Sequence, residues 1–477
     1  MLFNSFEFLL FLPIVYILYW FVFNRSLPIQ NLLLLLSSYF FYGWWSWQFM
    51  GLLMLSTLID YLYGFGVASS NKKHSKFFLF LSIVNNLGIL AVFKYYNFFI
   101  LQFKEAFSLI GVTMNPTLIE VALPVGISFY TFHGMSYVID IYHGKQKPVR
   151  NFVDYAVFVS FFPLLVAGPI ERAAHLLPQI QIKRIFNYEQ AVSGIRQIIW
   201  GMFKKVVVAD TLATTVDLMF DQYTEYNGIS LLVGAVLFSF QIYGDFSGYS
   251  DIALGTAKLF GIELLSNFKF PYFSRDIAEF WRRWHISLSS WFRDYVYIPL
   301  GGSKRGKAMA VRNTIIIFLI SGFWHGASWN FIIWGAIHAV GFLPLLLLNR
   351  NRINTEHVVA HNRILPNRTE TWQMIKTFAF VTFAWIFFRA ETLTLAVNYI
   401  ARIAQNLIED PMQLLHPPSG LKALVYIIPM LIGDWAFRRN DRNYPINKWI
   451  GLILAVIAFV YLLAAFGKKA DFIYFQF

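Results

Sequence analysis

Long runs of apolar residues, separated by short polar segments, dominate the chain. The runs at 6–23, 152–170 and 329–348 are each close to the ~20 residues that an α-helix needs to cross a bilayer. Residues 31–69 form an apolar stretch about twice that length, and we expect a break near Ser46–Gly51 to divide it into two helices. The pattern predicts an all-α protein that crosses the membrane many times.

Further apolar segments raise the expected number of crossings to roughly ten to twelve by the same ~20-residue criterion. They lie at 77–101, 118–139, 313–325, 372–389, 421–437 and 449–466. The segment at 6–23 lacks a basic leader, so we expect a retained first helix and not a cleaved signal. We find no internal repeat, and we predict one membrane domain over 1–477 with a catalytic core at about 229–348.

Composition agrees with a membrane protein and narrows the partners. The chain is 57% hydrophobic and 14% charged, whereas soluble proteins are roughly 45–50% apolar and about 25% charged. The net charge of +13 fits basic cytoplasmic loops, and no segment offers the soluble basic face that nucleic-acid binding requires. The absence of cysteine excludes disulfides, a thiol nucleophile and thiolate metal ligands.

One stretch, from Asn267 to His338, concentrates histidine, arginine, carboxylate and tryptophan residues. Residues 270–300 are too polar to span a bilayer, and we expect interfacial helices or backbone buried in protein there. Because polar groups are costly at membrane depth, such a concentration is a functional-site hypothesis by default.

His325 ends an apolar segment and is flanked by Gly322 and Gly326, which lie four residues apart and permit close backbone approach. A buried, neutral imidazole at this position can accept a proton from a hydroxyl group. A structural histidine bonded between helices is the alternative from the residues alone.

His285 follows Trp281-Arg282-Arg283-Trp284. Helical spacing predicts one amphipathic helix with His285 on its buried side, and Glu279 is placed to pair with Arg283. An interfacial helix anchored by tryptophan and arginine is the simpler interpretation of this segment.

A basic group beside Gly301-Gly302 is suited to phosphates of a coenzyme or carrier, although a cytoplasmic positive-inside loop also explains its lysines. Its members are Arg282, Arg283, Arg293, Lys304, Arg305 and Lys307. Asp245 and Asp251 are six residues apart, and we expect either one to orient a histidine or to pair with an arginine. His133 and His338 fit satisfied core histidines.

Missing motifs argue against an ATP-driven pump, a nicotinamide enzyme and an α/β-hydrolase. The chain has no P-loop, no GxGxxG, no GxSxG and no HExxH pattern, and no spacing suits a metal. Composition and spacing leave an enzyme and a transporter both open.

Longer motifs resolve that choice by resemblance. The runs EFWRRWHISLSSWFRDYVYIPLGGS at 279–303 and SGFWHGASWNFIIWGAIH at 321–338 resemble the membrane-bound O-acyltransferase family. Shorter matching segments lie at 1–15, 123–142, 161–172, 241–255, 383–392 and 472–477. Within the family the chain is similar to the bacterial alginate O-acetylase branch, with peptidoglycan, cellulose and teichoic acid modifying proteins as relatives.

The resemblance implies a ring of helices around a thin centre, with a funnel on one side and a tunnel to the other. It places the active-site histidine at His325 and the second conserved polar residue at His285. We expect Arg282, Arg283, Trp324, Asp245 and Asp251 to support the site by binding donor or acceptor.

The implied reaction moves an acetyl or other acyl group from a cytoplasmic thioester, acetyl-CoA or an acyl carrier, with no bound cofactor. The implied partners are membrane lipid, an extracytoplasmic acetyltransferase and a polysaccharide acceptor at the bacterial inner membrane. A transporter and a non-catalytic scaffold of a polysaccharide-modification complex are the competing hypotheses; a transporter often has repeated halves, which the chain lacks.

Overall fold

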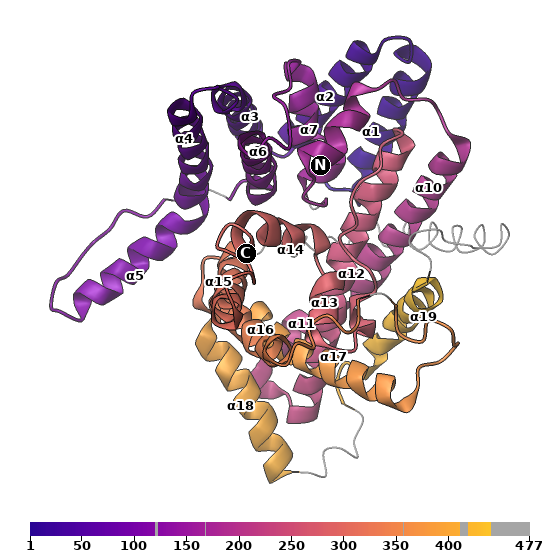
Figure 1. Cartoon of the computed structure of the whole chain (residues 1–477). Helices are drawn as coiled ribbons and strands as arrows, with labels where there is room; N and C mark the ends of the chain where they lie inside the picture. Colours follow the sequence, from indigo (N-terminus) through magenta and orange to yellow (C-terminus); the bar gives the residue numbers. More distant parts are fainter. Residues whose placement is uncertain (120–122, 167, 356, 411–417, 440–477) are drawn as a thin grey trace. The chain divides into compact units, whose positions relative to one another are not determined.

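The computed structural model describes residues 1–119, 123–166, 168–355, 357–410 and 418–439 (Figure 1). Across these ranges the regular structure is helical and contains no strand. Backbone contacts divide the chain into two compact units, 1–195 with 253–265 and 196–252 with 266–477. The prediction of a single membrane domain stays a prediction.

The first unit is built from short and medium helices. They are α1 (Phe6–Ile17), η1 (Leu18–Val22), α2 (Leu27–Gly43), α3 (Trp47–Val67), α4 (Lys72–Leu90), η2 (Ala91–Tyr95), α5 (Tyr96–Ser108), α6 (Ile127–Tyr142), α7 (Phe152–Ser160), α8 (Phe162–Leu165) and α9 (Ala173–Gln181). The expected break in the long apolar stretch is confirmed, because α2 ends at Gly43 and the Ser46 side chain accepts a hydrogen bond from Phe49 N to start α3. Helices α3, α4 and α6 pack against one another.

The division between the units falls inside α10 (Tyr188–Met202) and α12 (Gly228–Leu259). The second unit continues through η3 (Phe203–Ala209), α11 (Asp210–Asp221), η4 (Tyr223–Glu225), η5 (Pro271–Phe273), α13 (Ile277–Arg283), α14 (Ile286–Phe292), η6 (Arg293–Tyr297), α15 (Lys307–His325), α16 (Trp329–Leu347), α17 (Arg368–Arg389), α18 (Leu393–Glu409), η8 (Leu421–Tyr426) and α19 (Ile427–Phe437). Here α16 packs between α15 and α17 (Figure 1).

Within the part of the chain that the structure describes, five helical segments are long and apolar enough to cross a membrane. They are Trp47–Val67, Lys72–Ser108, Gly228–Leu259, Lys307–His325 and Trp329–Leu347. The protein is thus a polytopic all-α membrane protein, as predicted. The larger count of ten to twelve crossings stays a prediction, and its last segment, 449–466, lies outside the described residues.

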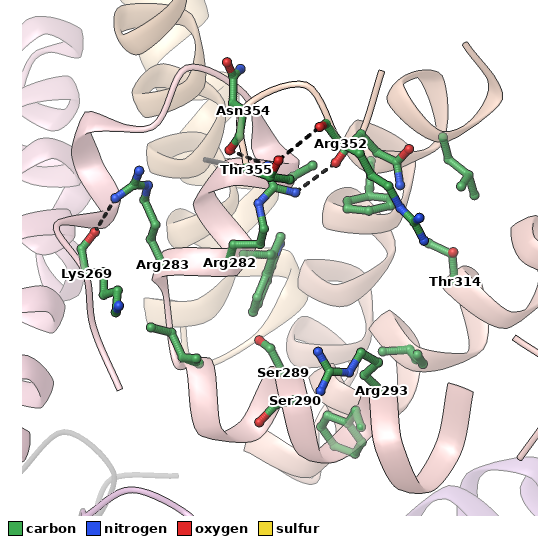
Figure 2. Close-up of a pocket in the computed structure, with 18 of the residues that line it drawn as sticks. Lys269, Arg282, Arg283, Ser289, Ser290, Arg293, Thr314, Arg352, Asn354 and Thr355 are labelled. Carbon is green, nitrogen blue, oxygen red and sulfur yellow. Dashed lines mark hydrogen bonds between the residues drawn. The ribbon is translucent and has the colours of Figure 1, made fainter. Parts of the chain in front are cut away.

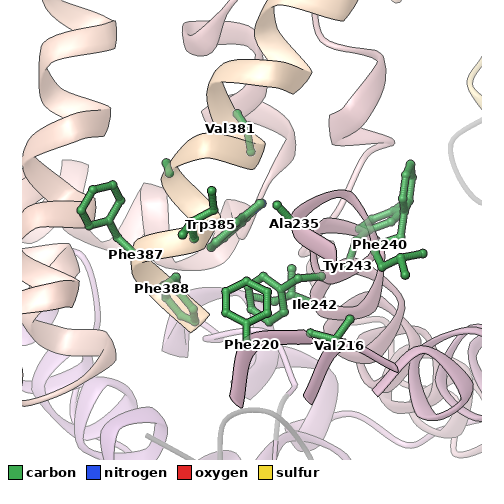
Figure 3. Close-up of a cluster of buried hydrophobic side chains, with 14 of the residues drawn as sticks. Val216, Phe220, Ala235, Phe240, Ile242, Tyr243, Val381, Trp385, Phe387 and Phe388 are labelled. Carbon is green, nitrogen blue, oxygen red and sulfur yellow. The ribbon is translucent and has the colours of Figure 1, made fainter. Parts of the chain in front are cut away.

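The second unit has an aromatic core formed by α11, α12, α16 and α17 (Figure 3). Phe220 of α11, Phe238 of α12 and Trp385 of α17 are almost fully buried in it. Trp385 stacks on Trp334 of α16 with ring centroids 5.6 Å apart. In a membrane protein such rings stabilise the packed helices mainly through close van der Waals contact. This core forms one wall of the site described next.

Candidate active site

His325 is the last residue of α15, and its position depends on close packing between α15 and α16. Gly322 lies so near α16 that a methyl group on it would meet the carbonyl oxygen of Phe331 at 2.1 Å. Only glycine permits this approach, so the expectation of close backbone contact at Gly322 is confirmed. The His325 residue is 4% exposed, and its ring centroid lies 5.1 Å from that of Trp334.

His285 lies between two short helices. We predicted one continuous amphipathic helix, but α13 ends at Arg283 and α14 begins at Ile286. His285 itself has φ 44° and ψ 53°, the left-handed conformation. Few non-glycine residues adopt it, and it costs of order 1–3 kcal/mol where the surrounding structure imposes it. The prediction of a continuous helix is wrong because sequence spacing does not report such a local reversal.

The break brings the two predicted histidines together. The ring centroids of His285 and His325 are 6.3 Å apart. His285 also contacts Phe246 edge-on at 4.7 Å and Trp324 at 5.9 Å. Trp324, predicted as a supporting residue, is 4% exposed and lies beside His325.

The His285 imidazole is fully buried and, among the described residues, has no hydrogen-bond partner on either ring nitrogen. Burial alone lowers the pKa of His285 to about 3, because a charged imidazole loses its hydration there. The ring is therefore neutral near pH 7 and presents one N–H donor and one nitrogen acceptor. An unpaired buried polar group usually needs an explanation such as a catalytic role.

We expected Asp245 or Asp251 to orient a histidine or to pair with an arginine, but each of them lies beside a lysine. Asp245 Oδ1 lies 2.6 Å from Lys205 Nζ. Asp251 forms a salt bridge with Lys204 and accepts a hydrogen bond from Gln197 Nε2 at 2.9 Å. The lysine partners come from η3, more than 35 residues earlier in the sequence, so spacing around the aspartates gave no sign of them.

A pocket of about 850 Å³ is lined by residues close in sequence to both histidines, although neither histidine is among its lining residues (Figure 2). It is lined by Ser321, one turn before His325, and by Ile286, the residue after His285. Its floor is apolar, with Trp281, Phe318 and Phe342. Its cationic side chains are Lys269, Arg282, Arg283, Arg293, Arg352, Arg438 and Arg439, and among the described residues no carboxylate lines it.

Two predicted arginines build this pocket as well as lining it. Arg282 donates to the carbonyl oxygens of Asn351 at 2.8 Å and Asn354 at 3.0 Å. Arg283 bonds Glu279 at 2.9 Å, as its spacing predicted, and also donates to Lys269 O at 3.1 Å. Figure 2 shows Arg283 pointing toward Lys269 and Arg282 pointing toward Asn354.

Residues far away in sequence also belong to the pocket. Arg352, Asn354 and Thr355, from the loop between α16 and α17, line the pocket. Lys304, Arg305 and Lys307, which we had grouped with the arginines, are not among its lining residues. The loop carries no motif, so the sequence alone held no signal for its role.

Two further polar residues were not predicted as part of the site. His338 of α16 accepts a hydrogen bond at Nδ1 from Trp281 Nε1, 3.3 Å away, and lies against Trp334. Asn267 is 1% exposed and pairs with the backbone next to His285. Within the described ranges no three His, Asp or Glu residues lie close enough to hold a metal ion.

The chain can now be compared with known proteins. The family model of the membrane-bound O-acyltransferase family matches residues 149–375. A probable alginate O-acetylase of Pseudomonas putida is 37% identical, over 99% of this chain and 88% of that protein. A peptidoglycan O-acetyltransferase of Helicobacter pylori is 32% identical over 100% of this chain and 98% of its own.

A teichoic acid D-alanyltransferase of Streptococcus thermophilus is 31% identical over 61% of this chain and 75% of its own length. The similarity to the first two proteins covers nearly the whole of each chain, including the segments that carry both histidines. The chain therefore belongs to the membrane-bound O-acyltransferase family and is an O-acyltransferase of the membrane.

Proposed function

We propose that this enzyme moves an acetyl or related acyl group from a cytoplasmic thioester to a hydroxyl group on an extracytoplasmic polysaccharide, at the bacterial inner membrane. The observation that carries the proposal is the cationic pocket that ends one helical turn from His325. Two named relatives, an alginate O-acetylase and a peptidoglycan O-acetyltransferase, support a polysaccharide acceptor.

The pocket fits a donor that is anionic at one end and apolar along its length. Arginine binds phosphate well because its planar fork matches two phosphate oxygens. Arg352 and Arg293 line the pocket and are placed to contact such a group. Acetyl-CoA and the phosphopantetheine arm of an acyl carrier share this chemistry, and both remain candidate donors.

The reaction then runs between the two histidines. The acceptor hydroxyl gives its proton to His325 while its oxygen bonds to the thioester carbon. The carbonyl oxygen becomes negative and is stabilised by His285, which is neutral and has an N–H to donate. The carbon–sulfur bond breaks, and the thiolate takes the proton back from His325.

A test of the proposal is to replace His325 with alanine in cells and to measure polymer-linked O-acetyl ester at matched membrane expression. Losing a general base lowers turnover about 10²- to 10⁴-fold, so the ester should fall to background. His143→Ala is the control, because His143 is exposed and lines no part of the pocket.

Persistence of the ester in the His325→Ala strain would overturn the proposal and favour a scaffold or transport role. Membrane vesicles supplied with either acetyl-CoA or an acyl-loaded carrier protein would identify the donor. If an extracytoplasmic acetyltransferase receives the acyl group first, a donor with a labelled acyl group should label that protein when the acceptor polymer is withheld.

A further inference from the structure

Asn267 lies directly beside the backbone of His285. Its carbonyl oxygen accepts a hydrogen bond from Ile286 N at 2.9 Å, and Lys269 N donates to Arg283 O at 3.0 Å. These two bonds join the segment 267–269 to the end of α13 and the start of α14, on either side of the left-handed residue His285. This pairing fixes where the side chains of Asn267 and His285 can be.

The two ends of the Asn267 amide have different environments. Its Oδ1 accepts a hydrogen bond from Ser287 Oγ at 2.5 Å, which sets the orientation of the amide plane. Its Nδ2 is buried and has no hydrogen-bond partner within the ranges the structure describes. An amide nitrogen carries two N–H donors, so this end of Asn267 offers donors that the protein itself does not use.

The unpaired Nδ2 of Asn267 and the unpaired ring of His285 thus come from neighbouring backbone positions. Both residues are at most 1% exposed, so bulk water does not satisfy them. Leaving two polar groups unpaired in one place is unfavourable unless something else binds there. The left-handed backbone of His285 adds strain at the same point, and strain of this kind gathers at functional sites.

We propose that Asn267 is a catalytic residue, whose Nδ2–H donates a hydrogen bond to the carbonyl oxygen of the thioester together with the N–H of His285. This inference rests on the proposed function. Two donors fixed in place before the reaction favour the oxygen when it carries negative charge over the neutral carbonyl. Hydrogen bonds from buried donors are strong because the site excludes water.

The electrons and protons balance in this step. Attack by the acceptor oxygen moves the C=O electron pair onto the carbonyl oxygen, where Asn267 and His285 stabilise it, while His325 holds the hydroxyl proton. The pair returns as the carbon–sulfur bond breaks, and the thiolate receives the proton from His325. Neither Asn267 nor His285 changes its protonation state.

The decisive variant is Asn267→Asp, which keeps an oxygen to accept from Ser287 Oγ and removes both N–H donors. Turnover by the full-length protein in nanodiscs should fall about 10²- to 10³-fold, the usual effect of losing one oxyanion donor. The KM for the donor should change little, because the lost interaction is made chiefly in the transition state. Ser287→Ala removes the bond that orients the amide but keeps both Nδ2 donors of Asn267, so its effect should be clearly smaller.

A buried carboxylate can impair folding, so Asn267→Ala provides a second comparison. Asn267→Ala and Ser287→Ala both lose the Ser287 bond, and only Asn267→Ala loses the Nδ2 donors. The difference in turnover between these two variants isolates the donors. Equal turnover of the two, or turnover of Asn267→Asp within about twofold of wild type, would overturn the role of Asn267.

A spectroscopic probe separates this proposal from the proposed function. The probe is the analogue of acetyl-CoA in which a methylene group replaces the thioester sulfur. Its bound carbonyl stretch should be shifted to lower frequency by wild-type protein and by His325→Ala, and less so by Asn267→Asp. An unchanged shift in Asn267→Asp contradicts only the Asn267 proposal. Failure of wild-type protein to bind this analogue, and also the same analogue carried on the phosphopantetheine arm of an acyl carrier, contradicts the thioester donor and both proposals that depend on it.

Discussion

The second unit buries two groups of polar side chains, one of which is paired and the other unpaired. Along α12 and η3, the carboxylates of Asp245 and Asp251 are each matched with a lysine. At the break between α13 and α14, the His285 ring and the Asn267 amide nitrogen have no partner in the described part of the chain. Paired charges hold helices together, whereas unpaired polar groups are available to a substrate.

The two groups should control different properties of the protein, one its stability and the other its activity. A salt bridge that is broken on one side leaves a buried charge and is costly, so the lysine–aspartate group should control folding. An unpaired buried imidazole destabilises the folded state, so the histidine group should control turnover at some expense of stability. The three changes below test this difference, from the largest expected effect to the smallest.

Lys205→Met should cause the largest loss of stability. It removes the cation that lies 2.7 Å from Asp210 and 2.6 Å from Asp245 and leaves both carboxylates buried without it. We expect a loss of about 3–5 kcal/mol, measured by thermal denaturation in detergent.

Combining Lys205→Met with Asp210→Asn and Asp245→Asn removes the uncompensated charges, so it should restore much of the lost stability. Lys205→Arg, which keeps the charge, is the conservative control. A stability of Lys205→Met equal to that of wild type would show that the lysine–aspartate group does not hold the unit together.

His285→Leu should have the opposite pattern. Turnover should fall about 10²- to 10³-fold because an oxyanion donor is lost. Stability should rise by about 1–3 kcal/mol, since an unsatisfied buried polar ring is replaced by an apolar side chain. Activity assays and thermal denaturation of the same preparation measure both effects, and a destabilised variant would count against an unpaired ring.

The same variant gives a pH test. Burial lowers the pKa of His285 to about 3 from an ordinary 6.5, so the unfolded chain binds this proton more readily than the folded one. The free energy of unfolding is therefore independent of this group above about pH 6.5 and decreases as the pH falls from 6.5 towards 3. Stability of His285→Leu should therefore decline less than that of wild type over this range.

Gly322→Ala should change stability by no more than His285→Leu does, in the opposite direction, and should change turnover less. Its methyl group would lie 2.1 Å from the Phe331 carbonyl oxygen, so α15 and α16 must separate slightly. We expect a stability loss of about 1–3 kcal/mol and a lower turnover from displacement of His325. Gly88→Ala is the matched control, because a methyl group there meets no atom within 4 Å, and equal behaviour of the two variants would argue against a tight crossing.

Much of this protein follows from its sequence. Apolar runs near the length of a bilayer span are expected to be helical, because a helix supplies hydrogen-bond partners for its own backbone N–H and C=O groups where lipid supplies none. The break between α2 and α3 and the crossing at Gly322 also followed from residue type, since the serine cap and the glycine act locally. The long motifs around His285 and His325 identified the family.

Other features depended on contacts between distant segments. The left-handed residue His285 lies next to a backbone hydrogen bond from Ile286 to Asn267, which is 18 residues before His285 in the sequence. Asp245 forms a salt bridge with Lys205 of η3. At the pocket, Arg282 donates hydrogen bonds to the carbonyl oxygens of Asn351 and Asn354, which belong to a loop that carries no motif. Sequence determined which segments are helical and where the chemistry lies, because hydrophobic length and local residue type set both. Only the tertiary structure decided which polar groups are paired and which stay unpaired, because that depends on the three-dimensional distance between residues far apart in the chain.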